Sequence, residues 1–157
     1  MSFIGQADVN IDKKSRLAIP AKFRAVLEKK NLGPGWVCMP RGEQLWLFPE
    51  ASFDELSAKW TPSLIPDEDT QMLLTSVFGS AERVDMDATG RVTLFKKHLA
   101  MTGLSGEVTV AGANSHLVIH NRATWEAGEM ERYTQLPIQI AKLNARQAQG
   151  GPIQAHG

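Results

Sequence analysis

The residues in this chain best suited to chemistry are an aspartate and an arginine that stand four positions apart, and the pair occurs twice. Residues 12–19 read DKKSRLAI, and residues 87–94 read DATGRVTL. An aspartate that begins a turn can accept backbone N–H groups, and it can also orient the arginine. Arginine presents planar donors that suit phosphate oxygens or the edge of a guanine. Two copies of a cationic loop suit a repetitive anionic polymer better than one small substrate.

The motif residues divide into those that could bind and those that could shape the loops. We expect the basic side chains to form a DNA-binding surface, namely Lys13, Lys14, Arg16 and Arg91. We expect the others to structure the loops, namely Asp12, Asp87 and Gly90, because glycine adopts a positive φ without strain. The alternative is an Asp–Arg salt bridge that closes a turn and binds nothing. Duplication, and the two lysines of the first loop, favour binding.

The sequence around the motifs is duplicated as well. Asp12 precedes Asp87 by 75 residues, and the segment 45–53 precedes its counterpart 117–125 by 72 residues. A loop absorbs such a small length difference easily. The repeat predicts four parts, namely a first unit over residues 3–58, an acidic helical linker over 59–79, a second unit over 80–136 and a tail over 137–157 whose end is disordered. Each unit is too small to bury a secure core alone, so the two should complete one core.

Each motif is expected at the tip of a β-hairpin that a helix follows. Alternating apolar residues predict strands over 6–11 and 16–19, and Pro20 is placed to open the helix. The remaining pattern predicts strands over 36–39 and 45–48, a helix from Pro49, a helix from residues 67–69 to a cap at Gly79, and an equivalent second set with a helix over 96–101 and strands near 108–110 and 117–119. A helix is expected around Trp125 to Tyr133, and the tail can continue as a short helix after Pro137.

Charge and composition exclude several classes of function. The net charge of the 157 residues is zero, but residues 1–30 carry +4 and residues 31–80 carry −5. A local basic field can attract a polyanion, although a solvated helix face is the alternative interpretation. No apolar run approaches the ~20 residues of a membrane helix, and the first residues do not resemble a secretion signal. The single cysteine, Cys38, fits a reducing cytosol and a buried structural thiol.

Catalytic signatures are missing from the sequence. The four histidines do not combine with Cys38 or carboxylates at metal-binding spacing. No glycine-rich phosphate loop and no nucleophile signature occur. We therefore expect no enzymatic activity, no cofactor, no metal and no small-molecule substrate.

The doubled Asp-x-x-x-Arg motif and the order of elements resemble the MraZ family over nearly the whole chain. The resemblance implies a β-rich α+β fold of two tandem AbrB/SpoVT-like swapped-hairpin units, which form one pseudo-symmetric double-split β-barrel body with flanking helices. Three places depart from the family pattern: Ser15 replaces the usual glycine of the first loop, Phe95 replaces the usual helix-opening proline, and His120–Asn121 stands where the family often has a tryptophan-containing segment. Serine tolerates a left-handed conformation poorly, so the first turn should be strained.

The same resemblance implies a function and a set of partners. It implies a cytoplasmic, nucleoid-associated transcriptional regulator, a repressor, that binds double-stranded DNA sequence-specifically. Its targets would be short direct repeats upstream of the division and cell-wall gene cluster, and it would act as a ring-like homo-oligomer. The alternative is an oligomeric structural or protein-interaction module without specific DNA binding. Salt-dependent DNA binding distinguishes the two.

Overall fold

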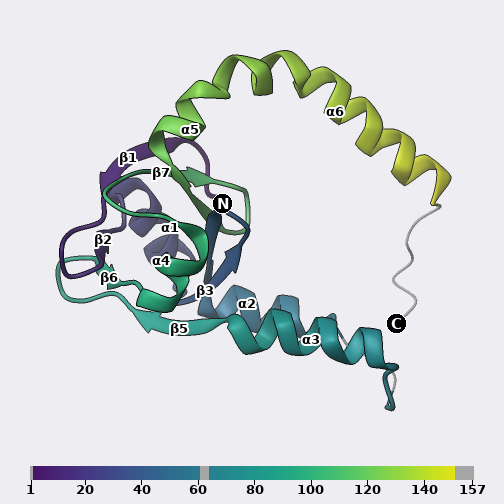
Figure 1. Ribbon diagram of the computed structural model, residues 1–157, viewed down its shortest axis with the longest axis horizontal. Helices are drawn as coiled ribbons and strands as arrows, with labels where there is room; N and C mark the ends of the chain where they lie inside the picture. The colour runs from purple at the N-terminus through teal and green to yellow at the C-terminus, as the bar shows by residue number, and fades with distance from the viewer. Residues whose placement is uncertain (1, 61–63, 151–157) are drawn as a thin grey trace. The chain divides into compact units, whose positions relative to one another are not determined.

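The computed structural model describes residues 2–60 and 64–150, which form a mixed α+β, sheet-rich protein (Figure 1). The chain divides into two compact units, residues 1–123 and 124–157. The elements in chain order are β1 (Gln6–Asn10), β2 (Arg16–Ala18), α1 (Ala21–Lys30), β3 (Gly35–Arg41), β4 (Gln44–Pro49), α2 (Glu50–Ala58), α3 (Glu68–Ser80), β5 (Glu82–Asp85), β6 (Arg91–Thr93), α4 (Lys96–Thr102), β7 (Glu107–Gly112), β8 (Leu117–Asn121), α5 (Arg122–Ala127) and α6 (Glu129–Gln149).

The strands all lie in the first compact unit, residues 1–123, and form two antiparallel sheets. Six strands pair in the order β1-β7-β8-β4-β3-β5, and β2 pairs with β6 separately. The ladders of the described residues do not close into a barrel, because β1 and β5 are the two edges of the larger sheet. The predicted double-split barrel is therefore not confirmed, and the structure shows an open sheet and a separate two-stranded ladder.

The predicted local hairpins are wrong, because each strand next to a motif pairs with the other repeat. β1 pairs with β7, and β2 pairs with β6, so β1 and β2 lie in different sheets. The first loop nevertheless closes as expected, since the Asp12 N–H donates to the Arg16 carbonyl at 3.0 Å. An isolated two-stranded hairpin is marginally stable, and exchange between repeats lets both motif strands bury their apolar residues in a shared core.

The strand register is the same when the two repeats are exchanged. Val9 pairs with Val108 in the β1–β7 ladder, and the equivalent positions Val84 and Trp36 pair in the β5–β3 ladder. The β2–β6 ladder is centred on Leu17 and Val92, which are themselves equivalent positions. The two halves of the sequence thus occupy equivalent places in the sheets.

One hydrophobic core joins both repeats. Leu17, Val92, Trp36 and Val108 are completely buried and belong to a single cluster. A second, smaller cluster lies around Phe48, where Phe53 of α2 and Phe78 of α3 meet it. Because Leu17 and Val92 come from the motif strands, the packing of the core fixes where the two loops emerge.

The helix starts follow the sequence closely. Pro20, Pro49 and Phe95 occupy the N-cap positions of α1, α2 and α4, so Phe95 replaces proline without loss of the helix. Asp67 caps α3, and its carboxylate accepts the Thr70 N–H at 2.7 Å. The predicted cap at Gly79 is wrong, because α3 continues to Ser80.

The described part of the second compact unit, residues 124–150, is mainly helical. The helix predicted after Pro137 is the second half of α6, a single helix of 21 residues that contains this proline. Proline lacks an N–H and crowds the carbonyl four residues earlier, which accounts for the curvature of α6 in Figure 1. The predicted disordered end, residues 151–157, lies outside the described residues. Within the described part of the chain, the helices lack the length and apolar character that a membrane crossing requires.

Candidate nucleic-acid interface

The first loop is organised by the Asp12 carboxylate. Its Oδ1 atom accepts the backbone N–H groups of Lys14 and Arg16, each at 2.9 Å. Its Oδ2 atom accepts the Nε–H of Arg16 at 2.7 Å. One side chain therefore holds both the backbone of the turn and the guanidinium of the arginine.

The second loop repeats this arrangement around Asp87. Its Oδ1 atom accepts the N–H of Thr89 at 2.9 Å, the hydroxyl of Thr89 at 2.7 Å and the N–H of Arg91 at 3.0 Å. Its Oδ2 atom accepts the Nε–H of Arg91 at 3.0 Å. In both loops the aspartate contacts the guanidinium of the arginine through Nε–H, which leaves the two Nη groups outside this contact.

The residue before each arginine has a left-handed backbone. Gly90 has a φ of 81°, which glycine adopts freely, and Ser15 has a φ of 63° at the equivalent position. Residues other than glycine adopt this conformation at a cost of about 1–2 kcal/mol. The strain that the sequence predicts for the first loop is therefore located at Ser15.

Hydrogen bonds from the loops lower the pKa values of both aspartates. The pKa of Asp12 lies below its ordinary value, chiefly because the Arg16 N–H stabilises the carboxylate. The pKa of Asp87 is lowered further, first by the Arg91 N–H and then by the Thr89 hydroxyl. Both carboxylates are thus ionised at neutral pH, and each cancels the charge of its own arginine.

The two loops are joined edge to edge. The Ile19 N–H donates to the Gly90 carbonyl at 2.9 Å, and the Leu94 N–H donates to the Ser15 carbonyl at 2.8 Å. Since Leu17 and Val92 point inward, Arg16 and Arg91 lie on the opposite, outward face of the β2–β6 ladder.

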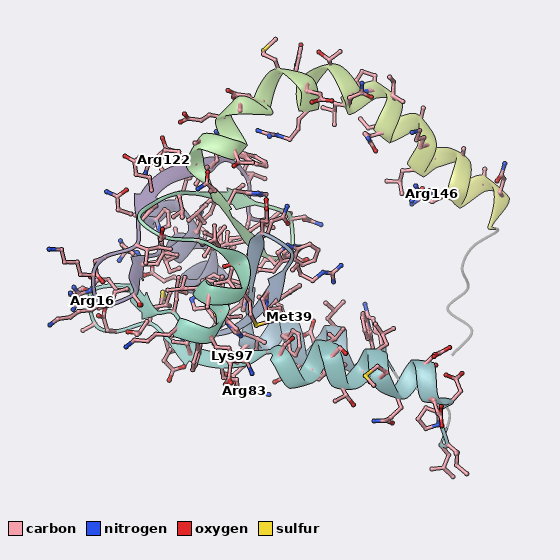
Figure 2. The ribbon with its side chains drawn as sticks, in the orientation of Figure 1. Arg16, Met39, Arg83, Lys97, Arg122 and Arg146 are labelled. Atoms are coloured by element: carbon pink, nitrogen blue, oxygen red, sulfur yellow. The ribbon has the colours of Figure 1, made fainter. Side chains whose placement is uncertain are left out.

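This register also brings the two arginines close together. Arg16 pairs with Thr93, and Arg91 pairs with Ala18, so Arg16 and Arg91 are diagonal neighbours with Cα atoms roughly 7–8 Å apart. Figure 2 shows Arg16 at the outer edge of the first compact unit, residues 1–123. The exposed side chains of Lys13 and Lys14 lie in the same loop. The structure thus brings the four predicted basic residues into one region.

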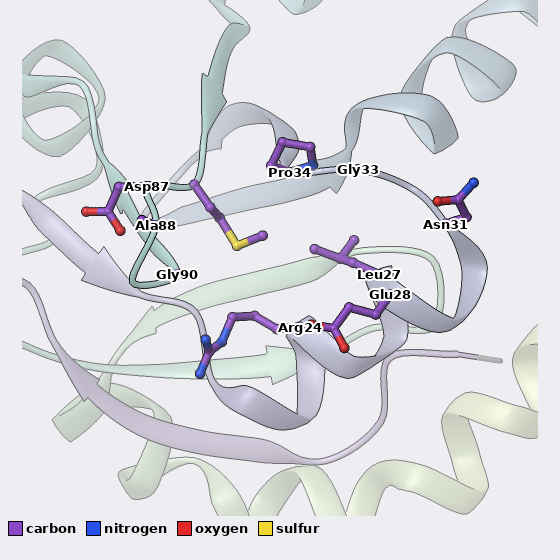
Figure 3. A pocket seen from close by; sticks show the side chains of 10 residues that line it. Arg24, Leu27, Glu28, Asn31, Gly33, Pro34, Asp87, Ala88 and Gly90 are labelled. Atoms are coloured by element: carbon purple, nitrogen blue, oxygen red, sulfur yellow. The ribbon is translucent and has the colours of Figure 1, made fainter.

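Arg24 is an additional basic residue of this region that the sequence did not single out. It lies on α1 and, together with Gly90 and Asp87, lines a cavity of about 340 Å³ between this helix and the second loop (Figure 3). The available signal was the repeat itself, because the position equivalent to Arg24 is the apolar Leu99.

The described residues contain no group of three or more histidine, cysteine or acidic side chains that could hold a metal ion. Burial raises the pKa of the Cys38 thiol to about 12, so this group is unreactive at neutral pH. The site thus consists of two Asp–Arg loops on one ladder, of which the first also carries two exposed lysines. The fold and the site place this chain in a class of sheet-rich α+β proteins that present a pair of charged Asp–Arg loops.

Comparison with known proteins identifies the family within this class. The family model described as MraZ protein matches residues 2–74 and 77–140, and the chain belongs to the MraZ family. Its relatives include three proteins with the name transcriptional regulator MraZ. The relative from Thiobacillus denitrificans is 32% identical over 80% of this chain and 84% of its own. The relative from Thermomicrobium roseum is 34% identical over 80% and 85%, and that from Mycobacterium avium is 29% identical over 79% and 84%.

Proposed function

We propose that this protein is a sequence-specific transcriptional regulator that binds double-stranded DNA through its two Asp–Arg loops. The observation that carries the proposal is the β2–β6 ladder, which presents Arg16 and Arg91 on one outward face. Guanidinium groups suit phosphate oxygens and guanine edges, and here they are pre-oriented by Asp12 and Asp87. The relatives' shared name, transcriptional regulator, supports the same function.

The roles of the loop residues follow from their contacts. Lys13, Lys14, Arg16 and Arg91 are the residues that meet the DNA, whereas Asp12, Asp87 and Gly90 give the loops their shape. The first loop has a net positive charge, because Asp12 cancels Arg16 and leaves the two lysines. The second loop has no lysine, and Asp87 cancels Arg91. The two loops therefore differ in electrostatic attraction for phosphate.

We also propose that the repeats are two AbrB-like swapped-hairpin units, residues 3–58 and 80–136, connected by the acidic helical segment 59–79. The exchange of motif strands between repeats and the equivalent registers of the ladders support this description. The protein would be located in the cytoplasm, at the nucleoid, and would repress genes for division and the cell wall.

Binding to short direct repeats requires more than one copy of the chain, and we propose a ring-like homo-oligomer. Exposed apolar side chains on α6 support self-association, namely Tyr133, Leu136, Ile140 and Leu143. The same stripe is compatible with the alternative function, an oligomeric protein-interaction module that does not bind DNA specifically.

A gel shift with the DNA directly upstream of the protein's own gene tests the proposal. Arg16→Ala and Arg91→Ala should each weaken specific binding by roughly 1–3 kcal/mol if the arginine contacts a base edge. If an arginine contacts phosphate alone, binding to all sequences should weaken and the salt slope should fall by about one.

Arg146→Ala is the matched control, because this exposed arginine lies on α6 outside the loops (Figure 2). The assignment is wrong if both loop variants and their double mutant bind as tightly as the control. Binding that is absent at every salt concentration would favour the interaction module.

A further inference from the structure

The side chain of Arg24 reaches from α1 to the backbone of the second loop (Figure 3). A Cβ atom at Gly90 would lie 2.7 Å from Cδ and 2.8 Å from Nη1 of Arg24. Real Cβ atoms do not approach other heavy atoms so closely, so the guanidinium occupies the space that a side chain at position 90 would need. Glycine is thus required at position 90 by the positive φ, and any larger residue there would also displace the end of the Arg24 side chain.

Gly90 is held from two sides by the first repeat. Its carbonyl accepts the Ile19 N–H at 2.9 Å, and the Arg24 side chain fills the place where a Cβ atom at position 90 would stand. The loop residue next to it is Arg91, whose orientation depends on where Gly90 lies. A shift of Gly90 would therefore be transmitted directly to Arg91.

The position of Arg24 is unfavourable for an arginine without a function. Its Nε atom is buried and lacks a hydrogen-bond partner in residues 2–60 and 64–150. An unpaired buried donor destabilises the folded state, so its presence calls for a reason. A leucine, which stands at the equivalent position 99 and packs against the main core, would avoid this cost.

The two loops differ at the positions that this contact joins. The second loop has Gly90 next to Arg24 of the first repeat. The equivalent positions for the first loop are Ser15 and Leu99. The second loop has uncharged residues, Ala88 and Thr89, where the first loop has its lysines. A guanidinium beside Gly90 thus brings a positive charge to the loop that has no lysine and whose own arginine is paired with Asp87.

We propose that Arg24 is a positioning residue of the DNA interface, which fixes the second loop through Gly90 and thereby orients Arg91 toward DNA. The proposal rests on the proposed function, since it concerns the same loops. It assigns the support of the second loop to a helix of the first repeat.

The test uses the full chain and the upstream DNA described above. Arg24→Leu introduces the residue found at position 99, and Arg24→Lys keeps the charge but removes the planar group. Lys29→Leu is the control. The substitution removes the same charge from α1, but Lys29 is exposed and does not line the cavity. Melting temperatures show which variants fold, and Arg24→Lys is the variant to use if Arg24→Leu does not.

We expect Arg24→Leu to weaken DNA binding by about tenfold and Arg24→Lys to weaken it by a smaller factor. Added to Arg91→Ala, Arg24→Leu should cause no further loss, because both changes disable the same arginine. In the DNA-free protein, hydrogen exchange at the Gly90 and Arg91 amides should become faster than in the Lys29→Leu control.

Affinity equal to that of Lys29→Leu would overturn the proposal. Additive losses with Arg91→Ala, a salt slope reduced by about one and normal binding by Arg24→Lys would show a direct phosphate contact instead. If the wild-type protein does not bind this DNA, the proposed function fails. The exchange measurement then still decides the positioning role, because unchanged exchange at Gly90 and Arg91 overturns it.

Discussion

The aspartates of the two loops act through their charge within the loop. Each carboxylate accepts two backbone N–H groups and one arginine Nε–H, and this leaves little capacity for another ligand. In the proposed DNA complex a nearby phosphate would repel a carboxylate, and the internal pairing of the aspartate charge reduces that repulsion. The same contacts produce a measurable pH dependence.

We expect Asp12 and Asp87 to titrate below the ordinary aspartate pKa, with Asp87 the lower of the two. Since both folded-state pKa values are depressed, the loop contacts contribute fully above the unfolded pKa of about 3.9 and are lost as the pH falls through the folded values. Carboxyl carbon chemical shifts, followed against pH, measure both transitions. Midpoints near 4 for both groups would show that the aspartates do not hold the turns.

Ser15 offers a route to a more stable protein. Replacing it by glycine should raise the free energy of unfolding by roughly 0.5–1 kcal/mol, because relief of the left-handed strain exceeds the added freedom of the unfolded chain. Gly90→Ala should lower it, because Ala would meet both the positive φ and Arg24. Chemical denaturation compares the two variants with the wild type. Lower stability of Ser15→Gly would mean that the serine hydroxyl has a compensating role.

At the level of elements, the β2–β6 ladder is the feature that couples the core to the proposed binding surface. In each three-residue strand an outward arginine is followed by a fully buried residue. The same strand therefore packs into the core and presents an arginine on the surface. Loss of packing on the inner face should therefore disturb the outer face.

Leu17→Ala tests this coupling. Removal of a fully buried leucine costs about 2–5 kcal/mol of stability, and we expect a loss in this range by chemical denaturation. DNA affinity should fall as well, although Leu17 does not face outward. Ile4→Ala is a suitable control, because Ile4 is 75% exposed. Full affinity in a destabilised Leu17→Ala protein would show that the ladder does not position the loops.

The sequence predicted local structure better than strand pairing. Pro20, Pro49 and Asp67 indicate helix starts because their effects are confined to one turn, and the structure confirms all three. The partner of each motif strand could not be predicted in this way, because Leu17 would satisfy a local hairpin and an exchanged ladder equally well. The contact of Arg24 with Gly90 was missed for the same reason, since it joins residues that are distant in sequence.

At the scale of the whole molecule, one chain offers only two arginines and two lysines to DNA in its loops. Few phosphates can then be neutralised by each copy, so a single copy should bind weakly at physiological salt. Several linked copies bind more tightly through effective concentration without new contacts per copy.

Light scattering should therefore give a mass several times 17.3 kDa. Affinity should fall steeply when one DNA repeat is deleted or moved by half a helical turn, about 5 bp, because successive sites must face the same side of the duplex. A scrambled site of equal length controls for non-specific binding. A monomer that binds one isolated repeat as tightly as the full array would exclude the multivalent mechanism.

The exchanged ladders also have an evolutionary consequence. In a symmetric dimer of identical chains, every substitution in a loop occurs twice. Here both loops are encoded in one chain, so each can mutate independently while the shared core keeps them side by side. The two loops do differ in this way, since one carries two lysines where the other has Ala88 and Thr89. A gene that has duplicated in this way can specialise one copy for attraction and the other for discrimination.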